Sequence, residues 1–478
     1  MIKPQIAIYH TMCVLSMAFT AQMYAQTTSP FVFLENIPIP NWTNTGATQA
    51  NLDLFAFNPW NRVLYVADRT NHAVTMIDTI NNSVIGVLPI PGGGNTNGVM
   101  VAIDIQKLVV TDGKANVIVY DLRIPSLDPE VYALPGVTGG TDALEYNPLN
   151  KTVYVINGAA PYFMTGIDLV NRKIKSQLAL PGSPELMRFN PNDGLIYQAI
   201  TDGDNAGKGK GLYVFDPVAN KITPRNLTPD CTPHGVEIDP VSNVLLLGCS
   251  PGGQVMIDLR PGGGVINTFA NLTGTDLTAF NPNTRNFYTG SGSNNIASTG
   301  CPTDSSKNFP LLGIFNAPTA GKANFGAVQC TGRSAKGPGV NPLDNFVYVG
   351  TRQYPVDAAS PDTGKSGVLV YWDSTPRLDA TPGSSAPIMA LDGKASLGLM
   401  RFTTEQKRGL RGTANLQGIA AGPALVVVPT TIGIETVPCF ESTDGTGFCD
   451  GPLLGAPMVG APVLLGANGS PVGRGVIQ

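Results

Sequence analysis

The chain has 478 residues, of which 13% are charged, and its formal net charge is −4 at pH 7. No basic stripe stands out, so the charge pattern does not support a nucleic-acid-binding surface, and 42% hydrophobic residues argue against intrinsic disorder. The 55 Gly and 40 Pro residues predict frequent turns rather than long helices.

The first 25 residues predict a secretory signal peptide. Lys3 supplies positive charge, TMCVLSMAFTA forms an apolar core, and Ala25 is a small residue at a suitable cleavage position. We therefore expect a secreted or periplasmic protein. The apolar run is too short to span a bilayer, so no membrane span is expected in the mature chain.

A repeated unit follows the signal segment. Its clearest copy, residues 57–92, predicts an Asn-Pro turn, an alternating apolar strand, a polar loop and two further strands. Seven copies occur, about 40 to 60 residues apart, with openings at Phe57, Ile103, Tyr146, Phe189, Ile238, Phe280 and Val340.

Seven repeats of four short antiparallel strands predict an all-β fold, a seven-bladed β-propeller over residues 31–388. The run FVFLENIPIP, residues 31–40, precedes the first copy and alternates like an outermost strand. We expect it to complete the seventh blade and close the ring, which removes free sheet edges. A β-helix is the alternative, but it would have a shorter period.

The segment LYVADRTNHAVTMIDTINNSVIGVLPIP, residues 64–91, resembles the YVTN-type repeat of exported seven-bladed propellers. The segment PHGVEIDP, residues 233–240, is similar to the strand openings of that family. The resemblance covers residues 31–388. It implies the fold and export but leaves the activity open, because the family includes surface-layer and periplasmic binding proteins and related propellers include lactonases.

Residues 389–478 lack the repeat and are rich in Gly, Pro and Ala. The prolines disfavour a membrane helix. We expect an extension that packs on the propeller and contains strands, with Cys439 and Cys449 closing a short loop.

One position in each blade lies five residues before the turn Asn or Asp that ends the innermost strand. Six of these seven positions are ionisable in a chain with few charges. The innermost strand of a propeller blade begins near the mouth of the central channel, so we expect these side chains to form a ring there. The positions, named here the channel-mouth ring, are Asp53, Val99, Asp142, Glu185, His234, Asp276 and Lys336.

The ring has two interpretations. Four carboxylates near one axis repel one another unless a cation or a ligand compensates. A hydrated channel, with Lys336 supplying part of the compensation, is one interpretation. The other is a site in which one divalent cation, Ca²⁺, Zn²⁺ or Mn²⁺, binds to Asp142, Glu185 and Asp276.

The candidate site residues divide by chemistry. His234 and Glu185 are the candidates for acid–base catalysis. Polar contacts to a ligand are predicted for Asp53, Asn97, Asp142 and Lys336.

Six cysteines remain after removal of the signal segment with Cys13, and an even number in an exported chain suggests disulfides. Propeller topology places the first four of them on one side of the molecule, the side that also carries the long insertions at residues 201–211, 291–310 and 351–367. Free buried thiols are the alternative. The predicted pairs are Cys231–Cys249, Cys301–Cys330 and Cys439–Cys449.

Two functions follow from this pattern. The first is binding of a small molecule, a glycan or a protein at the channel-mouth face. The second is a metal-dependent hydrolase or lactonase, in which the cation polarises a carbonyl and His234 is the base for an attacking water; a lyase on the same ring would look identical. No Gly-x-Ser-x-Gly sequence supports a serine nucleophile, and three histidines are too few for multi-histidine metal centres.

Overall fold

The structure is a computed structural model that describes most of the chain beyond residue 30. The described residues are 31–42, 51–123, 128–202, 209–225, 231–270, 272–291, 311–319, 322–331, 335–351, 366–375, 385–405, 409–441 and 445–478. The predicted signal peptide lies outside them. Among them, no helix has the length and apolarity needed to cross a membrane.

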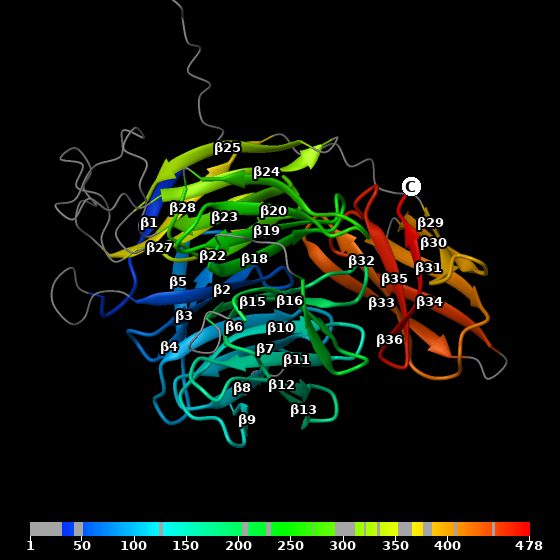
Figure 1. Ribbon diagram of the computed structural model, residues 1–478, viewed down its shortest axis with the longest axis horizontal. Coiled ribbons are helices and arrows are strands. Elements are labelled where there is room, and N and C mark those ends of the chain that lie inside the picture. Colours follow the sequence, from blue (N-terminus) through cyan, green and yellow to red (C-terminus); the bar gives the residue numbers. More distant parts are fainter. Residues whose placement is uncertain are drawn as a thin grey trace, which may run out of the picture.

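The described residues form seven four-stranded antiparallel sheets and one closed barrel, which confirms the predicted all-β propeller (Figure 1). The innermost strands contact one another in a closed ring, from the first blade round to the seventh. From the inside outward, the first four blades are β2 (Leu52–Asn58), β3 (Val63–Asp68), β4 (Ala73–Asp78), β5 (Ser83–Pro89); β6 (Thr96–Ala102), β7 (Lys107–Asp112), β8 (Asn116–Asp121), β9 (Glu130–Ala133); β10 (Thr141–Asn147), β11 (Thr152–Asn157), β12 (Phe163–Asp168), β13 (Lys173–Ala179); and β14 (Ser183–Phe189), β15 (Ile196–Asp202), β16 (Gly211–Asp216), β17 (Lys221–Pro224).

The last three blades follow the same order. They are β18 (Pro233–Asp239), β19 (Val244–Cys249), β20 (Gln254–Asp258), β21 (Val265–Phe269); β22 (Thr275–Asn281), β23 (Asn286–Ser291), β24 (Leu311–Thr319), β25 (Lys322–Cys330); and β26 (Pro338–Asn341), β27 (Phe346–Thr351), β28 (Gly367–Asp373), β1 (Phe31–Ile37). β1 pairs antiparallel with β28, from Phe31 opposite Asp373 to Ile37 opposite Val368. The N-terminal strand therefore closes the ring as predicted.

The Asn-Pro signature of the repeat makes the turn between the first and second strands of a blade. In the first blade the Asn58 side-chain oxygen accepts a hydrogen bond from the Trp60 backbone N–H at 3.0 Å, and that of Asn61 accepts one from Val63 N–H at 3.1 Å. Arg62 then takes φ = 57°, the left-handed conformation that ends the turn. Side-chain oxygens that replace backbone acceptors are why Asn and Asp recur at these positions.

The second strands of the blades are almost fully buried. All six residues are buried in β3, β7, β11, β19 and β23, because both faces of these strands are covered by neighbouring blades. This burial explains the nearly continuous apolar sequences of β3, β11 and β19, in contrast to the alternating exposed pattern of an outer strand such as β5.

Residues 385–478 form a second unit, a closed antiparallel barrel of eight strands. Around the barrel the order is β29 (Ser385–Ala390), β30 (Ser396–Glu405), β31 (Gly409–Gln417), β34 (Thr446–Pro452), β33 (Gly433–Glu441), β32 (Ala424–Thr430), β35 (Pro462–Ala467) and β36 (Ser470–Val476). Its interior has its own apolar core. The predicted extension is thus a folded domain, and the boundary expected at Ile388 falls inside β29.

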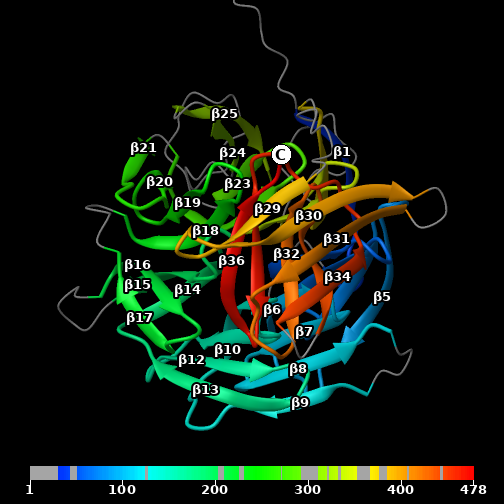
Figure 2. The same ribbon diagram turned by 90° about the vertical axis from the view of Figure 1, so that its right-hand side faces the viewer.

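The barrel packs on one face of the propeller, over its centre (Figures 1 and 2). Leu425, Val427 and Leu464 of the barrel belong to the same apolar cluster as the propeller core. Thr436 donates a hydrogen bond from Oγ1 to Asp104 Oδ2 at 3.1 Å, between the two units. The Asn-Pro turns contact the barrel, so the innermost strands end at this face and begin at the opposite one.

Candidate functional site

The channel-mouth ring lies at the face of the propeller that is remote from the barrel. Its members interact across the channel: Asp142, Asp276 and Lys336 all act electrostatically on Asp53. The Glu185, His234 and Asp276 side chains are 27%, 21% and 31% exposed, so a ligand can reach them. Val99 is buried, and neighbouring Asn97 donates a hydrogen bond to the Thr141 carbonyl at 2.6 Å.

One side of the ring is organised by an arginine that the sequence analysis did not single out. Arg69, directly after β3, forms an ion pair with Asp53 and lies 3.8 Å from Asp142 Oδ1. It comes from the loop between the second and third strands, whereas the predicted ring positions all lie at or near the beginning of innermost strands. An ionisable residue immediately after the second strand of a blade was the available signal, because that strand ends at the same face.

The other side of the ring brings together Glu185, His234 and Asp276. One potential ligand atom from each of these residues lies within 4.8 Å of the other two. His234 Nδ1 is 3.4 Å from Glu185 Oε1, and Lys336 Nζ is 3.0 Å from Asp276 Oδ2. Asp142, expected from the sequence to be a metal ligand, lies outside this group, and His234 takes its place.

The hydrogen bond on the far side of the imidazole defines the tautomer of His234. Its Nε2 lies 3.1 Å from the Ser250 carbonyl oxygen. Because a carbonyl only accepts, Nε2 must carry the proton, and the neutral ring therefore has its lone pair on Nδ1. Nδ1 is buried and has no hydrogen-bond partner in the described structure, although Glu185 is close. An unprotonated nitrogen beside a carboxylate is unfavourable unless a proton or a cation lies between them.

The Ser250 carbonyl is held by the adjacent chain. Cys231 and Cys249 form a disulfide, the pairing expected from the sequence, and Ser250 N–H donates to the Thr232 carbonyl at 2.9 Å. The described structure also pairs Cys439 with Cys449, which lie opposite each other on β33 and β34. The expected Cys301–Cys330 pair is not described, because Cys301 lies outside the described residues.

The ring's electrostatics favour added positive charge. Burial raises the pKa of Asp53 well above its usual value, although Arg69 opposes the shift. Burial and the charge of Glu185 raise the pKa of Asp142 to about 6. Burial lowers the pKa of His234, but the nearby Glu185 carboxylate, 3.4 Å from Nδ1, and the charge of Asp276 outweigh it, so the net shift is upward. With all four carboxyls ionised, Arg69 and Lys336 would compensate only two of the four negative charges, and the raised pKa values of Asp53 and Asp142 reflect this excess together with burial.

The raised pKa of Asp142 predicts a pH-dependent stability. Since the folded-state pKa of about 6 exceeds the usual 3.8, the folded state binds the proton more tightly, and stability present below about pH 4 is lost as pH rises through 6. The side chain is partly exposed, so we expect a loss of only about 1–2 kcal/mol between pH 4 and 7. Urea unfolding of wild type and Asp142→Asn across this range measures it. The free energy of unfolding of the variant should lack this pH-dependent loss. Parallel plots of unfolding free energy against pH for the two proteins would contradict the prediction.

A second charged cluster lies deeper in the channel, toward the barrel. Arg188 donates from Nε and Nη2 to Glu237 Oε1 at 2.8 and 2.6 Å, and from Nη1 to Glu145 Oε2 at 3.3 Å. Burial raises the pKa of both carboxyls, that of Glu145 to about 7. This channel triad, Glu145, Arg188 and Glu237, was not predicted, although each residue follows a ring position by three in its strand.

The barrel closes the channel beneath the channel triad. Thr430, Ile432 and Gly433, at the turn between β32 and β33, line a cavity of about 220 Å³ together with all three triad residues. The next cavity, about 320 Å³, is lined by propeller residues and by Ile434 and Thr436 of β33. A ligand in the channel therefore has its open access from the channel-mouth face.

No family model matches the chain, and no curated protein matches it. Solved structures do match. A chain in the crystal structure of the mitotic checkpoint complex is 14% identical with a TM-score of 0.51, covering 71% of this chain and 93% of that one. The RRP9 WD40 repeats are 10% identical with a TM-score of 0.53, covering 68% of this chain and 95% of that one. The chain shares the WD40-type propeller fold. At such identities the likeness shows the fold alone.

Proposed function

We propose that this chain is an exported propeller of the YVTN type that binds a small molecule, a glycan or a protein at its channel-mouth face. One divalent cation on Glu185, His234 and Asp276 is the anchor for that ligand. Support for export comes from the N-terminal sequence and from the Cys231–Cys249 and Cys439–Cys449 pairs.

The observation that carries the cation site is His234 Nδ1, which has no hydrogen-bond partner in the described structure but lies 3.4 Å from Glu185 Oε1 and close to the Asp276 carboxylate. A carbonyl that holds the far N–H of an imidazole is the usual way in which proteins orient a histidine toward a metal. The three ligand atoms are within 4.8 Å of one another, so small side-chain rotations would bring them around one ion. Carboxylate oxygens with one imidazole suit Zn²⁺, Mn²⁺ or Ca²⁺.

We expect calorimetric titration with Ca²⁺, Mn²⁺ and Zn²⁺ to show one site for at least one cation. Glu185→Gln/Asp276→Asn should weaken that binding at least about tenfold, because charge-assisted contacts are each worth about 1.5–3 kcal/mol. The matched control is Asp202→Asn, an exposed acid at the end of β15 outside the ring. Equal affinity of the double variant and wild type would refute the site.

A Lys336 variant is expected to change cation affinity in the opposite direction. It therefore distinguishes a cation site from a cluster of charges that only stabilises the fold. Lys336 lies 3.0 Å from Asp276 and competes with an added cation for that carboxylate. Lys336→Met should therefore tighten cation binding, whereas general damage to the ring would weaken it.

A metal-assisted hydrolase of the lactonase or esterase type, or a lyase, is the second candidate. It is favoured by the same tautomer of His234, whose Nδ1 can accept a proton from an attacking water near a cation held by Glu185 and Asp276. Lactones and aryl esters, assayed with and without the bound cation, test it. Turnover that needs the cation and is lost in His234→Gln would support catalysis, and no turnover with metal-loaded protein would leave binding as the function.

A further inference from the structure

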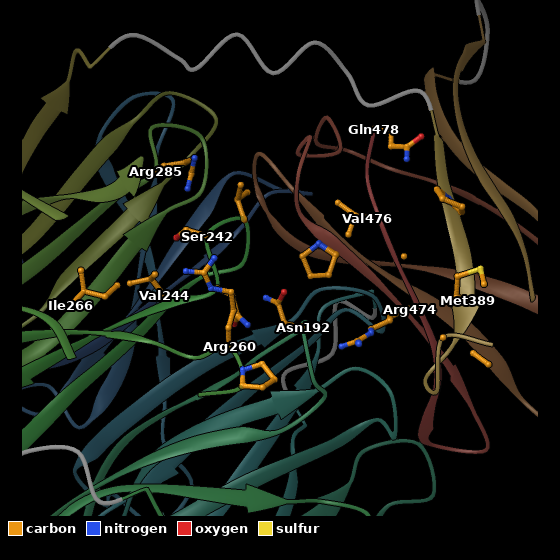
Figure 3. A pocket seen from close by; sticks show the side chains of 18 residues that line it. Asn192, Ser242, Val244, Arg260, Ile266, Arg285, Met389, Arg474, Val476 and Gln478 are labelled. Atoms are coloured by element: carbon orange, nitrogen blue, oxygen red, sulfur yellow. The ribbon is translucent and has the colours of Figure 1, made fainter. Parts of the chain in front are cut away.

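A cleft of about 1060 Å³ separates the propeller from the barrel, away from the channel-mouth ring. The propeller side is formed by β18–β23 residues such as Val244 and Ile266, and the barrel side by Met389 and Val476 (Figure 3). Its volume is at the upper end of the usual range for small-molecule sites.

The cleft combines an apolar lining with charged side chains that are all positive. Most of its lining is apolar, and its charged side chains among the described residues are three arginines, Arg260 and Arg285 from the propeller and Arg474 from the barrel. Figure 3 shows the Arg474 side chain reaching from the barrel toward the propeller, where Asn192 and Arg260 lie. No side-chain carboxylate of the described residues lines the cleft.

The three arginines differ in how much of their donor capacity is already used. Arg260 is paired with Asp258, and Arg285 with Asp239. Arg285 Nε is buried and has no hydrogen-bond partner in the described structure. Arg474 has no ion-pair partner among the described residues and is exposed at the cleft.

From this combination we infer that the interdomain cleft binds an organic anion with an apolar body, its anionic group on Arg474. An arginine presents a planar set of donors that suits a carboxylate. The apolar body would lie against Val244, Met389 and Val476 and replace water there. This site is separate from the proposed cation site, and its ligand has the opposite charge.

Calorimetry with decanoate below its micelle concentration tests the inference on the full mature chain. Decyltrimethylammonium has the same alkyl chain with the opposite charge, and acetate has the anion without the chain. We expect saturable binding of decanoate, and weaker or no binding of both comparison compounds.

Arg474→Gln should weaken decanoate binding about tenfold or more, the effect of one charge-assisted contact. Arg474→Lys should retain part of the affinity because the charge remains. Arg401→Gln, an exposed arginine of β30 outside the cleft lining, is the matched control and should bind like wild type.

Three results would overturn the inference. They are no decanoate binding, equal binding of the cationic analogue, or equal affinities of Arg474→Gln and wild type. Because Arg474 is exposed, its replacement is not expected to unfold the barrel, and circular dichroism checks this. Cation binding at the ring is measured in the same variants, so a failure here is distinguishable from a failure of the proposed function.

Discussion

Replacing Arg188 with Met is expected to lower the free energy of unfolding by about 3–5 kcal/mol at pH 8. Arg188 is the shared partner of Glu237, which is buried, and of Glu145, which is half-buried, in the channel. Its removal leaves the buried Glu237 and the half-buried Glu145 without compensating charge, and this cost exceeds the packing that the methionine preserves. Urea unfolding followed by circular dichroism measures the loss.

Two further measurements separate this charge effect from a packing effect. The loss should shrink at pH 5, because burial already raises the pKa of Glu145 to about 7 and a protonated carboxyl needs no partner. Arg188→Met combined with Glu145→Gln and Glu237→Gln should recover much of the stability. Arg123→Met, which breaks an exposed pair with Asp121, is the control and should change little. An Arg188→Met protein as stable as wild type would disprove the central role of the channel triad.

Removing the Cys231–Cys249 disulfide with two serines is expected to cost about 3 kcal/mol, given a sequence separation of 18 residues. The disulfide restrains the unfolded chain, and in the folded state it flanks the Ser250 carbonyl that orients His234. We therefore expect weaker cation binding as well as lower stability. Thermal unfolding and cation titration on the same variant measure both effects.

The other described disulfide supplies the comparison. Cys439→Ser/Cys449→Ser breaks a bridge between two barrel strands, far from His234 in the fold. It should lower stability but leave cation affinity at the ring unchanged. If both double variants change cation affinity equally, the disulfide at Cys231 has no specific role in the site.

The propeller could be predicted because its repeat has a local physical cause. The Asn58 and Asn61 side chains make the turn through hydrogen bonds within a few residues, so the same letters recur wherever the turn recurs. The ring positions follow from that register, since a fixed distance from the turn is a fixed height in the channel.

The barrel was not predicted because its closure depends on pairings far apart in sequence. β29 pairs with β36, and β32 pairs with both β33 and β35. No repeated turn sequence marks these strands, and glycines interrupt the alternation of apolar and polar residues along them. Gly466, for example, lies against Leu149 of the propeller, where a β-carbon would approach within 2.6 Å of a Leu149 methyl carbon.

The candidate site was predicted only in part for a similar reason. Counting back five residues from the turn in each innermost strand finds Glu185, His234 and Asp276. The count does not say which side chains of other blades they contact. The pairing of Arg69 with Asp53, and of Lys336 with Asp276, depends on side-chain reach between blades. The grouping of His234 with Glu185 and Asp276, rather than of Asp142 with them, likewise depends on side-chain positions that the strand register does not give.

The most direct test of the central claim is an anomalous diffraction map from crystals soaked in Mn²⁺ or Zn²⁺. A peak about 2.0–2.6 Å from Glu185, His234 Nδ1 and Asp276, absent from crystals of Glu185→Gln/Asp276→Asn, is the predicted result. A map without a peak at the channel mouth, from protein whose ring is otherwise well ordered, would contradict the claim. The ring would then be a hydrated channel whose charges compensate one another.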